Sequence, residues 1–323
     1  MPSSRCVIRG KVGAGILDKA DRLFRNDDLG TFVEILQNSR RAKATVVEVD
    51  IQRLRGSSEQ CVVTVQDNGA GIGDFEQLLT LGESGWGTET RAAEDPAGMG
   101  FYSLCLSGVE VYSGNQYAKI SPEAFLGKAD AIVQRRREYL QGTRLCFIRP
   151  SRKETLKTAL AQAARFCPLE VRLSGEALPR HDFLEGAIHR ELIDGIEIGF
   201  ATKFAHDWSY YGEDKNWNFY GARIHQAFPI IDGIVPEPPQ SGLLRLCARF
   251  NVLETGRIRL QLPERRSVIE DDFLRRFEKK ALTAAYGCLQ HACLRVGLVW
   301  PAMMTAGRCL GKIRPRSFRT LAA

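Results

Sequence analysis

The chain has 323 residues, of which 44% are hydrophobic and 26% charged, as in a globular protein of one large or two ordinary domains. No run of 18 apolar residues occurs, so the sequence predicts neither a membrane-spanning helix nor a membrane partner. The nine cysteines are scattered without a C-x-x-C pair, which argues against a zinc site or a disulfide framework and favours a reducing, cytoplasmic location.

The net charge of +7 comes from the C-terminal end of the chain. From Lys279 onward there are eight Lys or Arg residues and no acid, which leaves the preceding residues close to neutral. We call residues 279–323 the basic tail. Such a segment is suited either to nucleic acid, through contacts with phosphates, or simply to solvent as a frayed terminus.

The first half of the chain mixes helical and strand-like patterns. Apolar residues at helical spacing predict a helix over 31–42, and the Gly-rich segment 74–107 mixes helix and loop. A second helix is expected around 156–167. Strands are expected at 45–51, 61–66, 109–113, 117–120, 130–134, 144–149 and 170–173. This mixture predicts an α+β fold, an α/β sandwich in which a mixed sheet carries helices on one face.

The pattern changes after Ser174-Gly175, where we divide the chain into a first domain, 1–175, and a smaller second α/β domain, 176–323. Residues 187–260 alternate like strands with a loop at 235–242, and a helix is expected over about 270–294. The aromatic cluster DWSYYGEDKNWNFYG at 207–221 predicts a hairpin with cross-strand aromatic pairs or, alternatively, a partner-binding surface.

The first chemical motif is EILQNSRRA at 34–42, which places Glu34, Asn38 and Ala42 on one face of the expected helix. A carboxamide oxygen can ligate a hard cation such as Mg²⁺, and a carboxylate can take a proton from an attacking water. By itself the pair has little specificity, because Glu and Asn at this spacing occur on many surface helices.

The second motif is VQDNGAGIGD at 65–74, which follows a strand-like run. Its ligand positions do not suit an EF-hand, its glycine spacing does not match a dinucleotide fingerprint, and the Gly-Lys-Ser/Thr of a P-loop is absent. What remains is the carboxylate of Asp67, a strong hydrogen-bond acceptor at a strand end. The glycines that follow it allow a flat ring to approach the backbone.

The third motif is DPAGMGFYSL at 95–104, in which Gly98-Met99-Gly100 precedes an apolar run with a helical pattern. A glycine turn that enters a helix presents backbone N–H groups to an anion, although a plain helix cap is the simpler explanation. A fourth element, Gly142-Thr143, begins a late strand-like run.

The order of these motifs resembles that of the GHKL ATPases, the superfamily of gyrase, heat-shock chaperones, histidine kinases and MutL. The resemblance covers roughly residues 10–175 and implies a Bergerat-type ATP-binding fold for the first domain. It also implies ATP and Mg²⁺ as ligands, with Glu34 as the general base that activates water and Asn38 as the Mg²⁺ ligand.

At the other end of the nucleotide, the resemblance implies that Asp67 accepts the adenine amino group and that Gly71 makes room for the ring. Thr143 would bond the adenine region, and the main chain of Gly98 and Gly100 would close over the phosphates. LGESGWGTE at 81–89 falls where the family has its mobile lid. Four further neighbours complete the implied nucleotide site: Ala42, Gly69, Ile72 and Met99.

In several branches of the superfamily a second domain sends a Lys or Arg to the γ-phosphate. By position the counterparts here are Arg265 and Arg266, in RIRLQLPERRS at 257–267, although a charged hairpin tip explains them equally well. The chain departs from the chaperone and MutL pattern at Arg41, where several members carry an acidic residue.

The resemblance therefore implies a Mg²⁺-dependent ATPase whose lid closure and second-domain rearrangement act as a switch, coupled to homodimerisation and acting on a protein client. A histidine kinase is disfavoured because all five histidines, from His181 to His291, follow the ATP-binding domain. The alternative is a nucleotide-gated binding protein with little turnover, whose working surface is the aromatic cluster or the basic tail.

Overall fold

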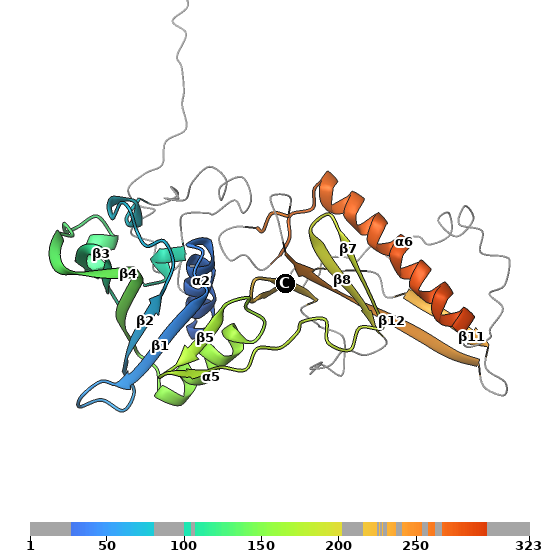
Figure 1. Ribbon diagram of the computed structural model, residues 1–323, viewed down its shortest axis with the longest axis horizontal. Helices are drawn as coiled ribbons and strands as arrows, with labels where there is room; N and C mark the ends of the chain where they lie inside the picture. The colour runs from blue at the N-terminus through green and yellow to red at the C-terminus, as the bar shows by residue number, and fades with distance from the viewer. Residues whose placement is uncertain are drawn as a thin grey trace, which may run out of the picture.

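The computed structural model describes residues 27–80, 100–104, 107–201, 216–224, 226, 228, 231–236, 241–253, 258–261 and 267–295. These residues form an α+β protein, as the sequence predicts, with two mixed sheets that each have a hydrophobic core (Figure 1). The first sheet ends at Ala177 and the second begins at His189. The predicted division at residue 175 thus lies just ahead of the change of sheet.

The first sheet has the strand order β3-β4-β2-β1-β5-β6. Its neighbouring strands are antiparallel except β1 and β5, which run parallel. The strands are β1 (Val46–Arg53), β2 (Cys61–Asp67), β3 (Val109–Ile120), β4 (Val133–Arg149), β5 (Glu170–Leu173) and β6 (Glu176–Ala177). Short helical segments in this part of the chain are η2 (Glu76–Leu78), η3 (Gly100–Leu104) and α4 (Pro122–Phe125).

Alternation along the strands gives this sheet one apolar face. In β1, Val47, Val49 and Ile51 are fully buried, and the residues between them are only half-buried. Because successive side chains point to opposite faces of a strand, these three line one face. The helices α2 (Asp28–Arg41) and α5 (Lys153–Ala164) pack against each other and share the core with that face (Figure 1).

Helix α2 begins three residues earlier than the predicted start at residue 31. Asp27 caps it, because the Asp27 carboxylate accepts a hydrogen bond of 2.7 Å from the backbone N–H of Gly30. Phe32, Ile35 and Leu36 form its buried stripe, and burying each such side chain stabilises the fold by roughly 1.5–3 kcal/mol. This stripe fixes the rotation of α2 and therefore which of its residues face the end of the sheet.

The second sheet has the order β10-β9-β12-β8-β7, and β11 pairs with β12. Its strands are β7 (His189–Ile193), β8 (Ile196–Ala201), β9 (Trp217–Phe219), β10 (Ala222–Ile224), β11 (Ile231–Pro236) and β12 (Ser241–Val252). Helix α6 (Asp272–Arg295) runs along this sheet (Figure 1). It buries Leu274, Phe277, Ala281 and Ala285 at helical spacing. None of the described helices is long and apolar enough to cross a membrane.

Two predicted strand breaks are wrong. The expected strands at 109–113 and 117–120 are one strand, β3, and those at 130–134 and 144–149 are one strand, β4. In the β3–β4 hairpin, Gln116 faces Arg135 and Tyr117 faces Gln134, and the following residues Ala118 and Ile120 of β3 are buried in the core. The first half of β4 is polar and largely exposed, so backbone pairing rather than apolar alternation holds it, and the sequence pattern misses it.

The aromatic cluster is described only from residue 216 onward. There, β9 and β10 pair antiparallel around a turn at Tyr220-Gly221. This hairpin differs from the predicted one, because its second strand follows the cluster and none of its cross-strand pairs joins two aromatic residues. Trp217 is buried and stacks on Phe250 of β12 with ring centroids 4.5 Å apart. This aromatic side chain therefore belongs to the core of the second sheet and not to an exposed surface.

The turn of this hairpin contacts the first domain. Gln37 of α2 donates from Nε2 to the carbonyl oxygen of Phe219 at 3.1 Å, and the guanidinium of Arg40 lies 3.5 Å from the centroid of the Tyr220 ring. Asn218 donates from Nδ2 to the carbonyl of Phe166, which follows α5, at 3.3 Å. Helix α2 consequently contacts the second domain as well as its own sheet.

Candidate functional site

Asp67, the last residue of β2, is the buried carboxylate on which the candidate site is built. Its Oδ1 accepts hydrogen bonds from the backbone N–H groups of Gly69 (2.9 Å) and Thr143 (3.2 Å). Its Oδ2 accepts one from the hydroxyl of Ser39 on α2, at 3.3 Å. We refer to Asp67, Ser39, Gly69 and Thr143 as the Asp67 cluster. Three donors leave Oδ2 with capacity for a further hydrogen bond, since a carboxylate accepts about four.

The pKa of Asp67 is raised above its usual value. Burial is the largest cause, and the hydrogen bonds from Gly69, Thr143 and Ser39 oppose it. The residue is only 9% exposed, so its carboxylate is poorly solvated. A ligand that donates a hydrogen bond there would meet a poorly solvated acceptor, where such a bond is stronger than in water.

The glycine turn after Asp67 is tied to β3 and β4. The hydroxyl of Ser113 accepts from the backbone N–H of Ile72 and donates to the carbonyl of Gly142, both at 2.8 Å. Gly71 has a φ of +78°, and a Cβ there would lie 2.6 Å from Ser113 Oγ. Gly71 is therefore required because the turn packs closely against Ser113 of the protein itself.

Gly142 is the most tightly enclosed glycine of the site. Its φ is +75°, and a Cβ there would lie 2.1 Å from the carbonyl oxygen of Asp67 and 2.8 Å from its Oδ1. Only a residue without a side chain allows β4 to pass this close to the end of β2. That approach lets the next residue, Thr143, donate its N–H to the carboxylate.

Helix α2 ends beside the Asp67 cluster. Its last turn leads to Ala42, whose carbonyl accepts from the N–H of Ala70 at 2.8 Å. Glu34 and Asn38 are half-buried and lie one turn apart on this helix, as predicted. Ser39, which follows Asn38, bonds to Asp67, so the structure joins the Glu-x-x-x-Asn helix to the strand end that carries the Asp.

The amide oxygen of Asn38 accepts a hydrogen bond of 2.9 Å from Nη1 of Arg41. A guanidinium at this distance repels a divalent cation from the same oxygen. In the described parts of the chain, no group of three or more His, Cys, Asp or Glu side chains is placed to hold a metal ion. Asn38, as it lies here, therefore does not fit the implied Mg²⁺ site.

The remaining predicted residues are placed only in part. Gly98, Met99, Arg265 and Arg266 lie outside the described residues, as does the expected lid at 81–89. Gly100 begins η3, which packs against α2. Tyr102 of η3 is buried and donates from its hydroxyl to the carbonyl of Leu79 at 2.8 Å. The chain that follows the predicted phosphate-binding turn is thus fixed beside the Glu34 helix.

The sequence did not reveal the structural roles of Ser39, Ser113 and Asn68. Ser39 and Ser113 supply hydroxyl groups that hold the Asp67 carboxylate and the glycine turn, and no local pattern distinguishes them from surface serines. Asn68 accepts from the N–H groups of Thr45 and Val46 at 2.8 and 3.0 Å, and so holds the entry to β1. Asn68 directly follows Asp67 in a strand–turn motif, and this position is the sequence signal that indicates a side-chain hydrogen bond to the backbone.

No protein-family model matches this chain, and no curated protein matches it. Among solved structures, the chain is similar to one titled "Crystal Structure of N terminal domain of a DNA repair protein", at 15% identity. The alignment covers 49% of this chain and 52% of that one, so it spans about half of each, with a TM-score of 0.32. A similarity at this level supports no conclusion about fold or function.

Proposed function

We propose that the chain binds ATP at the Asp67 cluster and hydrolyses it to ADP and phosphate in the manner of a GHKL ATPase. The observation that supports this most strongly is the buried carboxylate of Asp67 at a strand end, held by two backbone N–H groups and by Ser39 of the Glu34 helix. Because the four motifs resemble one superfamily in order, their partial assembly around one carboxylate favours one shared ligand.

Adenine recognition is assigned to Asp67. The exocyclic amino group of adenine donates a hydrogen bond, and the carboxylate is an acceptor with remaining capacity. Guanine presents an oxygen at the same position, and two acceptors repel each other. The cluster thus selects ATP over GTP.

Hydrolysis is assigned to Glu34. Its carboxylate takes a proton from a water molecule, whose oxygen attacks the γ-phosphorus in line, and the bond to the bridging oxygen of ADP breaks. The products are ADP and inorganic phosphate. Donors for the phosphates are expected from Gly98 to Gly100, and a cation from Arg265 or Arg266 to stabilise the developing charge.

Magnesium requires a rearrangement in this proposal. The resemblance assigns it to Asn38, whose oxygen accepts from Arg41, so Arg41 has to leave before a cation can bind. The same observation favours a second candidate function, a nucleotide-gated binding protein with little turnover. In both cases we expect a cytoplasmic protein that dimerises when nucleotide binds and acts on a protein client or, through the basic tail, on nucleic acid.

The two candidates are separated by measuring phosphate release with Mg-ATP and sizing chromatography with a non-hydrolysable ATP analogue. Turnover with analogue-driven dimerisation supports the ATPase, and binding with neither supports the second candidate. Glu34→Ala should lower turnover by about 10²-fold or more, the size of a general-base contribution, and leave ATP affinity unchanged. Hydrolysis by Glu34→Ala at the unmodified rate would show that the assigned base is wrong.

A further inference from the structure

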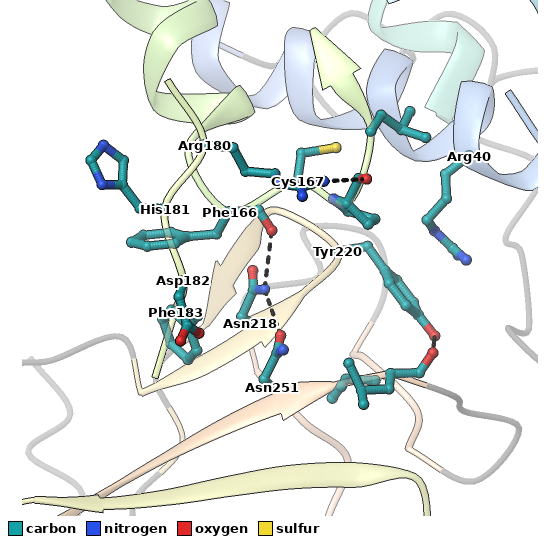
Figure 2. Close-up of a pocket in the computed structure, with 14 residues that line it drawn as sticks. Arg40, Phe166, Cys167, Arg180, His181, Asp182, Phe183, Asn218, Tyr220 and Asn251 are labelled. Carbon is teal, nitrogen blue, oxygen red and sulfur yellow. Dashed lines mark hydrogen bonds between the residues drawn. The ribbon is translucent and has the colours of Figure 1, made fainter. Parts of the chain in front are cut away.

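A cavity lies at the junction of the two domains, away from the Asp67 cluster. Its volume is about 410 Å³, within the range of small-molecule sites, which occur preferentially at domain interfaces. It is lined by residues from α2, the segment after α5, the segment before β7, the β9–β10 turn and β12 (Figure 2). The polar residues that matter for its chemistry are Arg40, Arg180, His181, Asn218, Tyr220 and Asn251.

The cavity has an excess of positive charge. Arg40 lies over the ring of Tyr220, and Arg180 donates from Nη1 to the carbonyl of Pro168 at 3.0 Å. A guanidinium has five N–H donors, so Arg180 retains donors for a ligand. One acid, Asp182, also lines the cavity, but its carboxylate bonds to Arg190 and to the N–H of Leu184, which compensates its charge.

The thiol of Cys167, which lines the same cavity, is affected by both arginines. Burial raises the pKa of this thiol, and the positive charges of Arg40 and Arg180 oppose that rise. Both guanidinium groups are therefore near enough to this buried thiol to influence it, although they come from different parts of the chain. Positive groups around a hollow concentrate the field there and attract anions.

The opposite wall is rigid and electrically neutral. Asn218 donates from Nδ2 to Asn251 Oδ1 at 2.8 Å (Figure 2). The Oδ1 of Asn218 accepts from the N–H of Gly221 at 3.0 Å. The hydroxyl of Tyr220 donates to the carbonyl of Leu253 at 3.3 Å. These bonds fix the second-domain side, so a ligand would meet a preformed wall and a pair of arginines.

We propose that this cavity binds a small organic or inorganic anion that carries carboxylate or phosphate groups. Guanidinium groups bind both through paired N–H donors, and the volume limits the ligand to the size of a metabolite. Arg40 belongs to α2 and Arg180 to the segment after β6, and both line the cavity opposite the neutral second-domain wall. A bound anion would therefore neutralise the two arginines at the junction of the domains.

The test uses isothermal titration of the full chain with citrate and with inorganic phosphate, at constant ionic strength and in separate arms. We expect saturable binding of at least one probe, and the responding probe identifies carboxylate or phosphate as the preferred group. Arg180→Gln should weaken that binding about tenfold or more, the effect of losing a charged hydrogen bond. Arg180 is exposed, so this variant should keep the unfolding midpoint of the unmodified chain.

Arg152→Gln is the matched control, because Arg152 is also exposed and pairs with Glu59 at the opposite end of α5. It should bind the probe within about twofold of the unmodified chain, since only weak surface electrostatics change. The proposal is overturned if neither probe binds saturably, or if both variants weaken binding equally. Binding that ATP displaces and that Arg180→Gln leaves unchanged would belong to a nucleotide site and would likewise overturn it.

Discussion

The Asp67 cluster and the junction cavity lie on either side of the same helix and are built differently. Around Asp67, two backbone N–H groups and the Ser39 hydroxyl hold one buried carboxylate, and these three donors belong to the first domain. Around the cavity, charged side chains of the first domain and the linking segment face polar groups of the second. The first arrangement depends on glycines and strand ends, and the second on long side chains that can move.

Two consecutive residues of α2 contact the two different regions. Ser39 bonds to Asp67, and Arg40 lies over Tyr220 of the second domain. Neighbouring side chains on a helix point about 100° apart, so one helix reaches both regions without a bend. The two regions therefore adjoin through one helix but share no residue.

Because the Asp67 cluster depends on glycines and backbone groups, we expect substitutions in its backbone to destabilise the protein more than substitutions around the cavity. Gly142→Ala should lower the free energy of unfolding by about 2–5 kcal/mol, because it combines a left-handed residue with a Cβ 2.1 Å from Asp67 O. Gly56→Ala, at φ +84° with open space around it, is the control and should cost only about 1–2 kcal/mol. Equal losses in urea unfolding would show that enclosure at Gly142 does not matter.

Arg41 is expected to compete with metal for Asn38. Arg41→Gln removes the guanidinium that bonds to the amide oxygen of Asn38. Because the screened repulsion between this charge and the cation is then lost, the Mg²⁺ concentration that half-saturates ATP turnover or Mg-ATP binding should fall several-fold. Lys43→Gln, which removes a nearby exposed charge, is the control. An unchanged Mg²⁺ requirement in Arg41→Gln would mean that Arg41 does not restrict the metal.

At the junction cavity, substitutions are expected to change the free energy of unfolding less than in the Asp67 cluster. Tyr220→Leu removes the ring beneath Arg40 and the hydroxyl bond to Leu253, and should lower the free energy of unfolding by about 1 kcal/mol. ATP affinity should stay unchanged, since the Asp67 cluster is untouched. A loss of ATP affinity in titrations of Tyr220→Leu would show that the two regions are not separable.

Much of the first domain could be predicted from its sequence, because apolar alternation and helical spacing mark elements that bury one face. Helix α2, β1, β2 and β5 follow these patterns closely. The polar end of the β3–β4 hairpin could not be predicted, since its pairing lies in the backbone. Ser39, Ser113 and the bond from Arg41 to Asn38 depend on tertiary distances that no local pattern contains.

The pKa of Asp67 also leads to a prediction about how stability depends on pH. Its raised pKa means that the ionised form is less favourable in the folded chain than in the unfolded one. Its contribution to stability is therefore fully present below the unfolded pKa and is lost as pH rises through the folded pKa. At neutral pH, Asp67→Asn should unfold at the same midpoint or a higher one, because the amide oxygen still accepts from Gly69 and Thr143.

The central claim is that the Asp67 carboxylate binds the adenine of ATP. The most direct test is titration of ATP into the unmodified chain and into Asp67→Asn, with thermal unfolding of both as the check on folding. We predict that the unmodified chain binds ATP in preference to GTP, and that Asp67→Asn folds normally but weakens ATP binding about 10–100-fold, as for a lost charged hydrogen bond. Equal ATP affinity in the two folded proteins would contradict the assignment of Asp67.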